Sequence, residues 1–432
     1  MNSTLNGEDC ELTIMPHALD DVVSCSETVY VTGEHIPATN NPSARGALGT
    51  MPAVHEALVR LILVLPIFAT FKEPVISFLR QRESGGGGGM GRPLGAGNGS
   101  APFFIFGDSL LDAGNNDYLN VSFKANRWPY GETFFHNATG RFCNGRIPPD
   151  FIAENANLPF IKPYLEPNFS DYTDGANFAS GGAGVLPQTL EGALYLELQV
   201  SLFAEMTERL KQQKGDSDAQ KLISRGVYHI GMGGNDYIHL ATDSLDDNAT
   251  ISPHDKEAFV HWVMGNLTTS INRLYRLGGR KFSFQNVAPI GCLPGSRYRT
   301  GTGGCLNDLN ILAEMHNEAL SELLAGLEKD LSGFNYVLFD YYKTLLDRIV
   351  NCTEFGFEVG ETACCGSGTY NGEWTCGVTG DHFTLCRKPK EYVFFDPAHP
   401  TEEVSRQLSE LMWSGEPPVM RPGNLKSLFE EP

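Results

Sequence analysis

The feature that most restricts the fold of this chain is an alternation of short apolar runs with longer helical stretches. The runs that predict strands are Phe103–Phe106, Ala176–Ala179, Val227–Gly231, Lys281–Asn286 and Tyr336–Asp340. The stretches that predict helices are Leu194–Lys214, His254–Leu277, Leu306–Leu331 and Thr401–Met412. Strands that alternate with helices in this way are typical of a parallel sheet with helices on both faces. The pattern therefore predicts one large α/β domain.

Ser109 stands at the end of the first predicted strand, where Gly107-Asp108-Ser109 interrupts the apolar run. We expect a helix to begin directly afterwards, at Leu110–Asp112. In open α/β sheets ligands bind at the carboxyl edge of the strands, and the unpaired N–H groups of a first helical turn suit an anion. Ser109 is therefore a candidate nucleophile, and a helix N-cap serine is the alternative interpretation.

A second candidate group lies far downstream, where Asp396 precedes His399 by three residues. An Asp at this spacing can bond His Nδ1, fix the tautomer of the ring and leave Nε2 free to act as a base. Pro397 and Pro400 stiffen the segment. In isolation the motif is more typical of a solvated surface loop. Together with Ser109 it gives a Ser, Asp, His order that predicts a catalytic triad.

Two glycine-rich turns follow predicted strands and supply candidate oxyanion donors. The turn at residues 177–184 contains Gly181 and Gly182, and its backbone N–H groups can approach a ligand closely. Asn235 follows the strand Val227–Gly231, and its side-chain amide can donate a hydrogen bond. Each turn taken singly is more often a plain strand terminator or a turn cap.

Together these four stretches resemble the GDSL esterase/lipase family of SGNH hydrolases, and most closely its secreted plant branch. The matching motifs are GDS at Ser109, NFASGGAG at Gly181, GGNDY at Asn235, DPAHPTE at Asp396 and His399, TGRFCNGR around Cys143 and NVAPIGCLPG around Cys292. The resemblance covers about residues 101–425. The chain departs from it at Cys143, where relatives usually carry Ser, and in the N-terminal hundred residues.

The resemblance implies a flavodoxin-like, three-layer α/β/α fold with five parallel strands. It also implies a carboxylic ester hydrolase with Ser109 as nucleophile, His399 as base and Asp396 as the residue that orients the base. The oxyanion donors would be the N–H of Ser109, the N–H of Gly181 and the amide of Asn235, with Gly182 left open as an alternative to Gly181. No metal and no cofactor are expected, and the protein is expected to be a monomer that acts on a small-molecule or lipid ester.

Other chemistries lack their motifs in this sequence. There is no G-x-S-x-G elbow, and no phosphate loop or dinucleotide fingerprint follows a strand. Two alternatives to hydrolysis stay open. One is an acyltransferase that uses the same triad with an alcohol acceptor, and the other is a secreted binding protein of the same fold without turnover. The natural substrate is not readable from the sequence.

The chain outside the domain divides into segments of different composition. We expect a disordered extension at 1–50, an apolar segment at 51–71, a Gly-rich linker at 72–100, the hydrolase domain at 101–425 and a tail at 426–432. The apolar segment has the proportions of a signal peptide if translation starts at Met51, and an amphipathic or buried helix is the alternative.

The remaining residue patterns point to the secretory route. Eight cysteines lie in the domain, and eight N-x-S/T sequons occur at Asn2, Asn98, Asn120, Asn137, Asn168, Asn248, Asn266 and Asn351. The cysteines favour disulfides over a zinc site, although their pairing cannot be derived. The net charge of −20 argues against nucleic-acid binding, and no run is long enough to span a membrane. We therefore expect a secreted, apoplastic glycoprotein.

Overall fold

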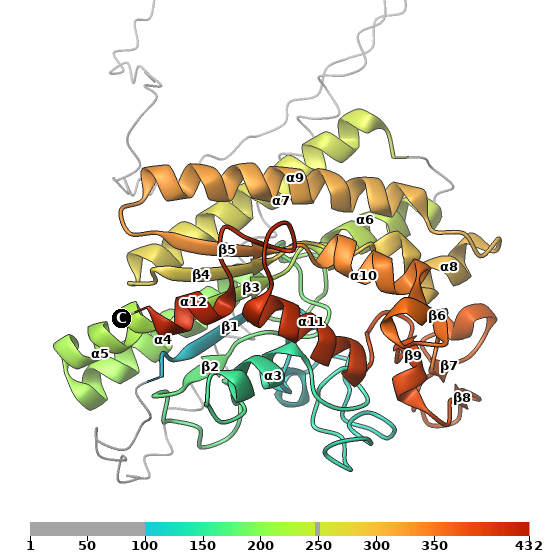
Figure 1. Ribbon diagram of the computed structural model, residues 1–432, viewed down its shortest axis with the longest axis horizontal. Helices are drawn as coiled ribbons and strands as arrows, with labels where there is room; N and C mark the ends of the chain where they lie inside the picture. Colours follow the sequence, from blue (N-terminus) through green and yellow to red (C-terminus); the bar gives the residue numbers. More distant parts are fainter. Residues whose placement is uncertain (1–99, 247–250, 432) are drawn as a thin grey trace, which may run out of the picture. The chain divides into compact units, whose positions relative to one another are not determined.

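The centre of the computed structural model is a six-stranded sheet in the order β10-β5-β4-β3-β1-β2 (Figure 1). The structure describes residues 100–246 and 251–431. The strands are β1 (Phe103–Gly107), β2 (Gly175–Asn177), β3 (Val227–Gly231), β4 (Lys281–Gln285), β5 (Asn335–Phe339) and β10 (Met420–Arg421). The first five run parallel, and β10 pairs with β5 in the antiparallel sense. The α/β fold class and the five parallel strands expected from the sequence are confirmed.

Side chains that alternate along β1 pack against helices on opposite faces of the sheet. Phe104 packs against Phe203 of α4 with a centroid distance of 5.2 Å, whereas Phe103 packs against Phe429 of α12 at 5.5 Å. One layer contains α4 (Leu196–Lys214), α7 (Pro253–Arg276) and α9 (Asn307–Asp330), and the other contains α3 (Pro148–Asn155), α11 (Glu402–Ser414) and α12 (Leu425–Glu430). Figure 1 shows the three layers, with α7 and α9 along one side of β4 and β5.

The remaining elements surround the carboxyl edge of the sheet and its flanks. The helices are α5 (Asp216–Arg225), α6 (Gly234–Asp246), α8 (Pro294–Thr300) and α10 (Tyr341–Val350). The short 3₁₀ helices are η3 (Asn115–Tyr118), η4 (Ile290–Cys292), η5 (Cys352–Phe355), η6 (Thr369–Asn371) and η7 (Pro389–Glu391). Two small sheets pair β6 (Val359–Ala363) with β9 (Tyr392–Phe394) and β7 (Cys365–Gly366) with β8 (Thr384–Leu385).

The C-terminal part of the fold extends further than the sequence pattern indicates. Strand β10 has two residues, so it carries no periodicity that a sequence pattern can detect. The predicted tail at 426–432 falls largely within α12, where Leu425 and Leu428 are buried. These apolar contacts fix the end of the chain on the sheet.

The prediction that a helix begins at Leu110 is wrong, because the backbone N–H groups of this segment donate to the side chains of Asp108 and Asp112. The Leu110 N–H donates to Asp108 Oδ1 at 2.9 Å. Asp112 Oδ1 accepts the N–H groups of Gly114 and Asn115 at 2.8 and 2.6 Å. Gly114 has φ of 127°, which a right-handed helix does not allow. The segment therefore forms a turn that leads into η3.

Three disulfides stabilise the domain. They join Cys292 to Cys305, Cys364 to Cys386 and Cys365 to Cys376, whereas Cys143 and Cys352 are free. The clustered cysteines that could have formed a zinc site, Cys364, Cys365, Cys376 and Cys386, are therefore bonded to one another in pairs. Disulfides of this kind indicate an oxidising compartment of the secretory route.

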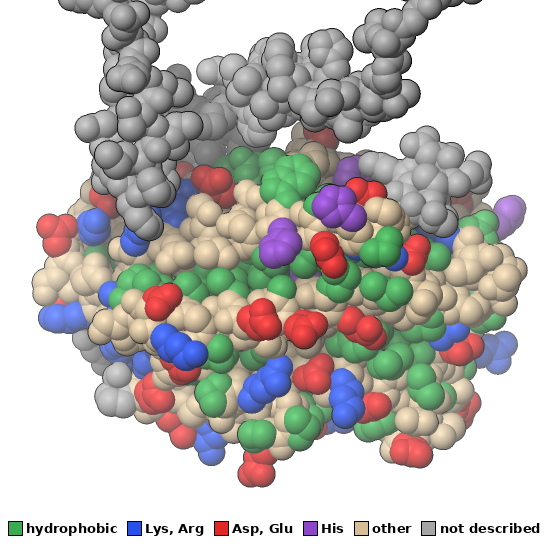
Figure 2. Space-filling model, turned by 90° about the horizontal axis from the view of Figure 1, so that it is seen from above, with side chains coloured by type: hydrophobic (Ala, Val, Ile, Leu, Met, Phe, Trp, Pro, Cys, Tyr) green, Lys and Arg blue, Asp and Glu red, His purple; other side chains and the backbone are tan. Residues whose placement is uncertain are grey.

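Several sequence-based expectations lie outside the described residues. They include the segments at 1–50 and 51–71 and the linker up to residue 99. Within residues 100–246 and 251–431, no helix combines the length and apolar character needed to cross a bilayer. On the face shown in Figure 2, acidic, basic and hydrophobic side chains are intermixed rather than gathered by type.

Candidate active site

Ser109, His399 and Asp396 come from distant parts of the chain and meet at the carboxyl edge of β1. His399 Nε2 lies 2.7 Å from Ser109 Oγ, and His399 Nδ1 lies 2.7 Å from both carboxylate oxygens of Asp396. All three residues are buried, with Ser109 at 6% exposure. The three side chains thus form one continuous hydrogen-bonded chain that ends on a serine hydroxyl.

The loop that carries Asp396 and His399 is closed by its own backbone. The Phe395 N–H donates to the His399 carbonyl at 2.8 Å, and Asp396 Oδ1 accepts the N–H groups of Ala398 and His399 at 2.9 and 2.8 Å. Burial by itself would raise the pKa of Asp396, but the charge and hydrogen bond of His399 and these backbone donors hold that pKa below its usual value. Asp396 therefore stays a carboxylate beside the imidazole.

Tyr130 adds a contact to this loop that the sequence does not reveal. Its hydroxyl donates to Asp396 Oδ2 at 2.9 Å, from a position 266 residues earlier in the chain. Burial, together with the negative charge of Asp396, raises the pKa of Tyr130 well above its usual value, so the phenol keeps its proton. The carboxylate of Asp396 thus accepts hydrogen bonds from the Tyr130 hydroxyl, from two backbone N–H groups and from the ring of His399.

Asn235 lies at the start of α6 and faces the same site. Its Nδ2 donates one hydrogen bond to the Ala183 carbonyl at 2.9 Å, which fixes the orientation of the amide. A side-chain amide has two N–H donors, so the second remains for a ligand. Asn235 also borders the pocket that contains Ser109 and His399.

The N–H of Gly181, which the sequence analysis expects to be an oxyanion donor, already has a hydrogen-bond partner. Its N–H donates to Asp112 Oδ2 at 3.0 Å, so this donor is already occupied by a buried carboxylate. Gly182, the alternative left open by the sequence, has φ of 77°. In the part of the chain that the structure describes, no hydrogen bond is found from the N–H of Gly182 or of Ser109. The Gly181 N–H is therefore occupied in this structure, whereas that of Gly182 remains available as a donor.

Two buried acidic residues, Asp112 and Asp236, hold the glycine-rich turn after β2 in place. Asp236 accepts the N–H groups of Val185 and Leu186 at 2.9 and 3.0 Å and the hydroxyl of Thr189 at 2.6 Å. Burial raises the pKa of Asp236, and burial raises that of Asp112 to about 7 although backbone N–H groups oppose the shift. Both residues stand inside motifs noted in the sequence, but their partners are set by tertiary contacts that no local pattern encodes.

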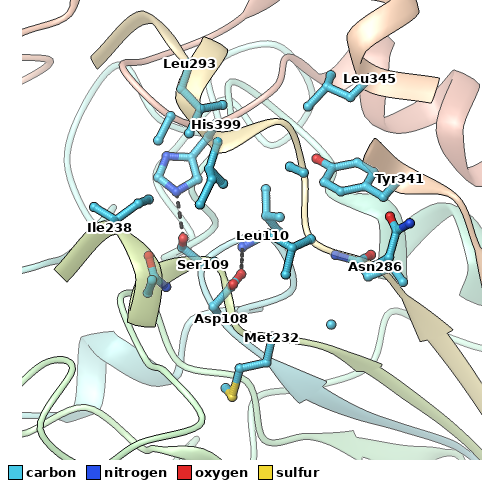
Figure 3. A pocket seen from close by; sticks show the side chains of 18 residues that line it. Asp108, Ser109, Leu110, Met232, Ile238, Asn286, Leu293, Tyr341, Leu345 and His399 are labelled. Atoms are coloured by element: carbon cyan, nitrogen blue, oxygen red, sulfur yellow. Dashed lines mark hydrogen bonds between the residues drawn. The ribbon is translucent and has the colours of Figure 1, made fainter. Parts of the chain in front are cut away.

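A pocket opens beside Ser109 and His399 (Figure 3). Its apolar lining comes from several elements and includes Leu110, Ile238, Val287, Ile290, Leu293 and Leu345. Asn286 and Tyr341 add polar groups at one side. Asp108, also in the lining, has its pKa raised by burial to about 6. Sequence patterns did not identify these pocket residues, since they meet only in the folded chain.

Comparison with known proteins establishes the family. The family described as GDSL-like Lipase/Acylhydrolase matches residues 103–412. This chain belongs to that family of ester hydrolases, as the sequence motifs indicated.

The chain is also similar to several plant proteins along most of their length. The chain is 46% identical to "GDSL lipase" of Tanacetum cinerariifolium, over 77% of this chain and 88% of that protein. It is 43% identical to "GDSL esterase/lipase 4" of Arabidopsis thaliana, over 76% of this chain and 90% of that protein. It is also 37% identical to "Inactive GDSL esterase/lipase-like protein 25" of Arabidopsis thaliana, over 76% of this chain and 75% of that protein. The family therefore includes a protein named as inactive, so catalysis depends on which residues stand at the site.

Proposed function

We propose that this protein hydrolyses carboxylic esters through a covalent acyl-enzyme on Ser109. The observation that carries the proposal is the pair of 2.7 Å contacts that His399 makes, one with Ser109 Oγ and one with Asp396. A serine hydroxyl is a weak nucleophile unless an adjacent base removes its proton, and this geometry supplies that base. The same base is held by a carboxylate that stays ionised.

The chemical steps follow from these positions. Ser109 Oγ attacks the ester carbonyl while His399 Nε2 takes its proton, and Asp396 stabilises the resulting imidazolium. His399 then gives the proton to the departing alcohol as the acyl-enzyme forms. Water attacks the acyl-enzyme with His399 again as base, the acid leaves, and Ser109 regains its proton.

Three donors are proposed to stabilise the oxyanion of the tetrahedral intermediate. The N–H of Ser109 and the free amide proton of Asn235 are supported by their position at one edge of the pocket. Gly182 replaces Gly181 as the third donor, since the Gly181 N–H is bonded to Asp112. Loss of one such donor typically lowers kcat about a hundred- to a thousandfold.

The pocket beside Ser109 is the proposed acyl site. Its apolar side chains suit a hydrocarbon acyl group beside the reacting hydroxyl of Ser109. We infer a small-molecule or lipid ester as substrate, turned over by a monomer without metal or cofactor. The net charge of −20 makes nucleic acid an unfavourable partner.

The direct test compares Ser109→Ala with wild-type protein on p-nitrophenyl esters of increasing acyl length. We expect turnover to fall by about 10⁴-fold or more. The matched control is Ser270→Ala, which removes a buried serine of α7 that does not line the pocket. Near-normal turnover by a folded Ser109→Ala variant would refute the assignment.

Two alternatives are separated in the same assay. If added alcohols divert most of the product from acid to a new ester, the protein is an acyltransferase with the same triad. If wild-type protein turns over no ester at any acyl length but still binds esters, it is a non-catalytic binding protein. Hydrolysis that depends on Ser109 excludes the second alternative.

We further propose that the protein is secreted to the apoplast and glycosylated. The disulfides support an oxidising route, and the sequon residues Asn120, Asn137, Asn168 and Asn351 are exposed. Glycosidase treatment of plant-expressed protein should increase its electrophoretic mobility, and an unchanged mobility would contradict the proposal. A tag placed before Met51 should be absent from the secreted product if translation starts at that residue.

A further inference from the structure

Three aromatic rings outside the pocket lining lie close to the ring of His399. The ring centroid of Phe142 lies 5.0 Å from that of His399, and those of Trp374 and Phe123 lie 5.9 and 6.2 Å away. Phe123 stacks on Phe142 at 4.7 Å, and Trp374 stands edge-on to Phe123 at 5.3 Å. None of these three rings lines the pocket that contains Leu110 and Leu345.

The outer part of this cluster is open to solvent next to the catalytic groups. Trp374 is 47% exposed, whereas Phe142 beneath is buried. Trp374 is one of only a few large hydrophobic residues with this exposure among those the structure describes. A large ring that is held beside the reacting atoms and still half open is suited to contact with a substrate.

The loop that carries Trp374 is fixed from several directions. The disulfide Cys365–Cys376 closes it. The Glu373 N–H donates to the Ser367 carbonyl at 3.1 Å, and the Ser367 hydroxyl donates to the Glu373 carboxylate at 2.5 Å. The backbone of Trp374 is therefore fixed by the disulfide and the hydrogen bonds of its loop, while part of its ring stays exposed.

Phe123 connects this cluster to the oxyanion turn. A Cβ placed on Gly182 would lie 3.3 Å from Phe123 Cδ1, so the ring is in van der Waals range of the turn that carries the proposed third donor. An ester bound with its carbonyl oxygen at the donors has its acyl group on one side and its alcohol group on the other. The acyl pocket takes the first, which leaves the aromatic side for the second.

We propose that Phe123 and Trp374 form an aromatic shelf that binds the alcohol portion of the ester and favours aromatic or other flat, apolar alcohols. This inference rests on the proposed function. The shelf lies beside His399, the group that protonates the departing alcohol, so it acts on the step that forms the acyl-enzyme. Aromatic faces and edges provide stacking and edge-to-face contacts that a small aliphatic alcohol cannot use.

The test compares two esters that share one acyl group, 2-naphthylmethyl butanoate and ethyl butanoate. In wild-type protein kcat/KM should favour the naphthylmethyl ester. Trp374→Ala should lower this preference by about five- to tenfold, the size expected when one aromatic contact is lost. Trp374→Phe, which keeps a ring, should retain most of the preference.

A matched control is Trp262→Ala, because Trp262 is similarly exposed at 51% but packs edge-on against Phe259 on α7. It should leave both esters unchanged. An unchanged preference in Trp374→Ala, or an equal loss for both esters, would overturn the shelf. A change in acyl-length preference instead would assign the rings to the acyl side and also overturn it. Failure of the proposed function is distinct, since it appears as hydrolysis that survives Ser109→Ala.

Discussion

The loop at residues 396–399 and the glycine turn at 180–184 both carry site residues that were predicted from short motifs, yet they are held differently. The first loop is closed by hydrogen bonds among its own residues, from Asp396 to the backbone and ring of His399. The second is held from outside, by Asp112 on the Gly181 N–H and by Asp236 on Val185 and Leu186. When the hydrogen-bond partners lie within a motif, the motif predicts how its side chains and backbone are oriented. When the partners lie elsewhere in the chain, the motif predicts only where in the fold its residues lie.

The choice between Gly181 and Gly182 as the proposed oxyanion donor illustrates this difference. The motif places two glycines in the turn, and either peptide N–H is chemically able to donate to an oxyanion. Which one faces the site depends on Asp112, which lies 69 residues away in sequence. If the comparison holds, the hydrogen bonds from distant residues position the glycine turn, whereas the loop at 396–399 keeps its geometry without them.

Among the variants outside the triad's nucleophile, the largest effect is expected for Asn235→Ala, which removes the only side-chain donor of the proposed hole. We expect kcat to fall about a hundred- to a thousandfold with little change in KM, because an oxyanion donor acts mainly on the transition state. Active sites counted by phosphonate titration keep the comparison independent of yield. An unchanged kcat per titrated site would limit the hole to backbone donors.

A smaller but still large effect is expected for Asp112→Asn. Asp112 Oδ2 accepts the N–H groups of Gly181 and Asn116, and an amide nitrogen in its place cannot accept these hydrogen bonds. We expect a loss of about 2 kcal/mol or more in the free energy of unfolding, and a kcat lower by about tenfold because the turn shifts. If denaturant unfolding and kcat are both unchanged, the outside contact does not position the turn.

The pH dependence of stability tests the protonation state of the Asp112 carboxyl independently of kcat. Its pKa is raised from an ordinary 3.8 to about 7, so between these pH values the folded state holds a proton that the unfolded state releases. Stability contributed by this group therefore falls as pH rises from about 4 to about 7. The difference in Tm between wild type and Asp112→Asn should shrink over this range, and a difference that stays constant or grows would show that the pKa of Asp112 is not raised in the folded state.

The smallest effect is expected for Tyr130→Phe. It deletes the bond to Asp396 Oδ2 but keeps the ring, which packs edge-on against Phe395 at 5.3 Å. Since the loop closes on itself, we expect kcat/KM to fall by less than about fivefold. A loss as large as that of Asn235→Ala would mean that the triad loop also depends on distant contacts.

Much of the fold was predictable because the parallel strands are buried on both faces and read as apolar runs. Strand β3 matches its predicted range, Val227–Gly231, and α9 differs from its prediction by one residue at each end. Strand β10, the disulfide pairing and the apolar pocket were not predictable, because each depends on residues brought together from distant parts of the chain. The same holds for Trp374, whose place beside His399 is fixed by a disulfide.

The central claim is that Ser109 becomes covalently acylated, and fluorophosphonate labelling followed by peptide mass spectrometry tests it most directly. The account predicts stoichiometric phosphonylation of wild-type protein, with the added mass confined to the peptide at Ser109. It also predicts loss of labelling together with loss of esterase activity in Ser109→Ala. Labelling at a different residue, or equal labelling and turnover in Ser109→Ala, would contradict it.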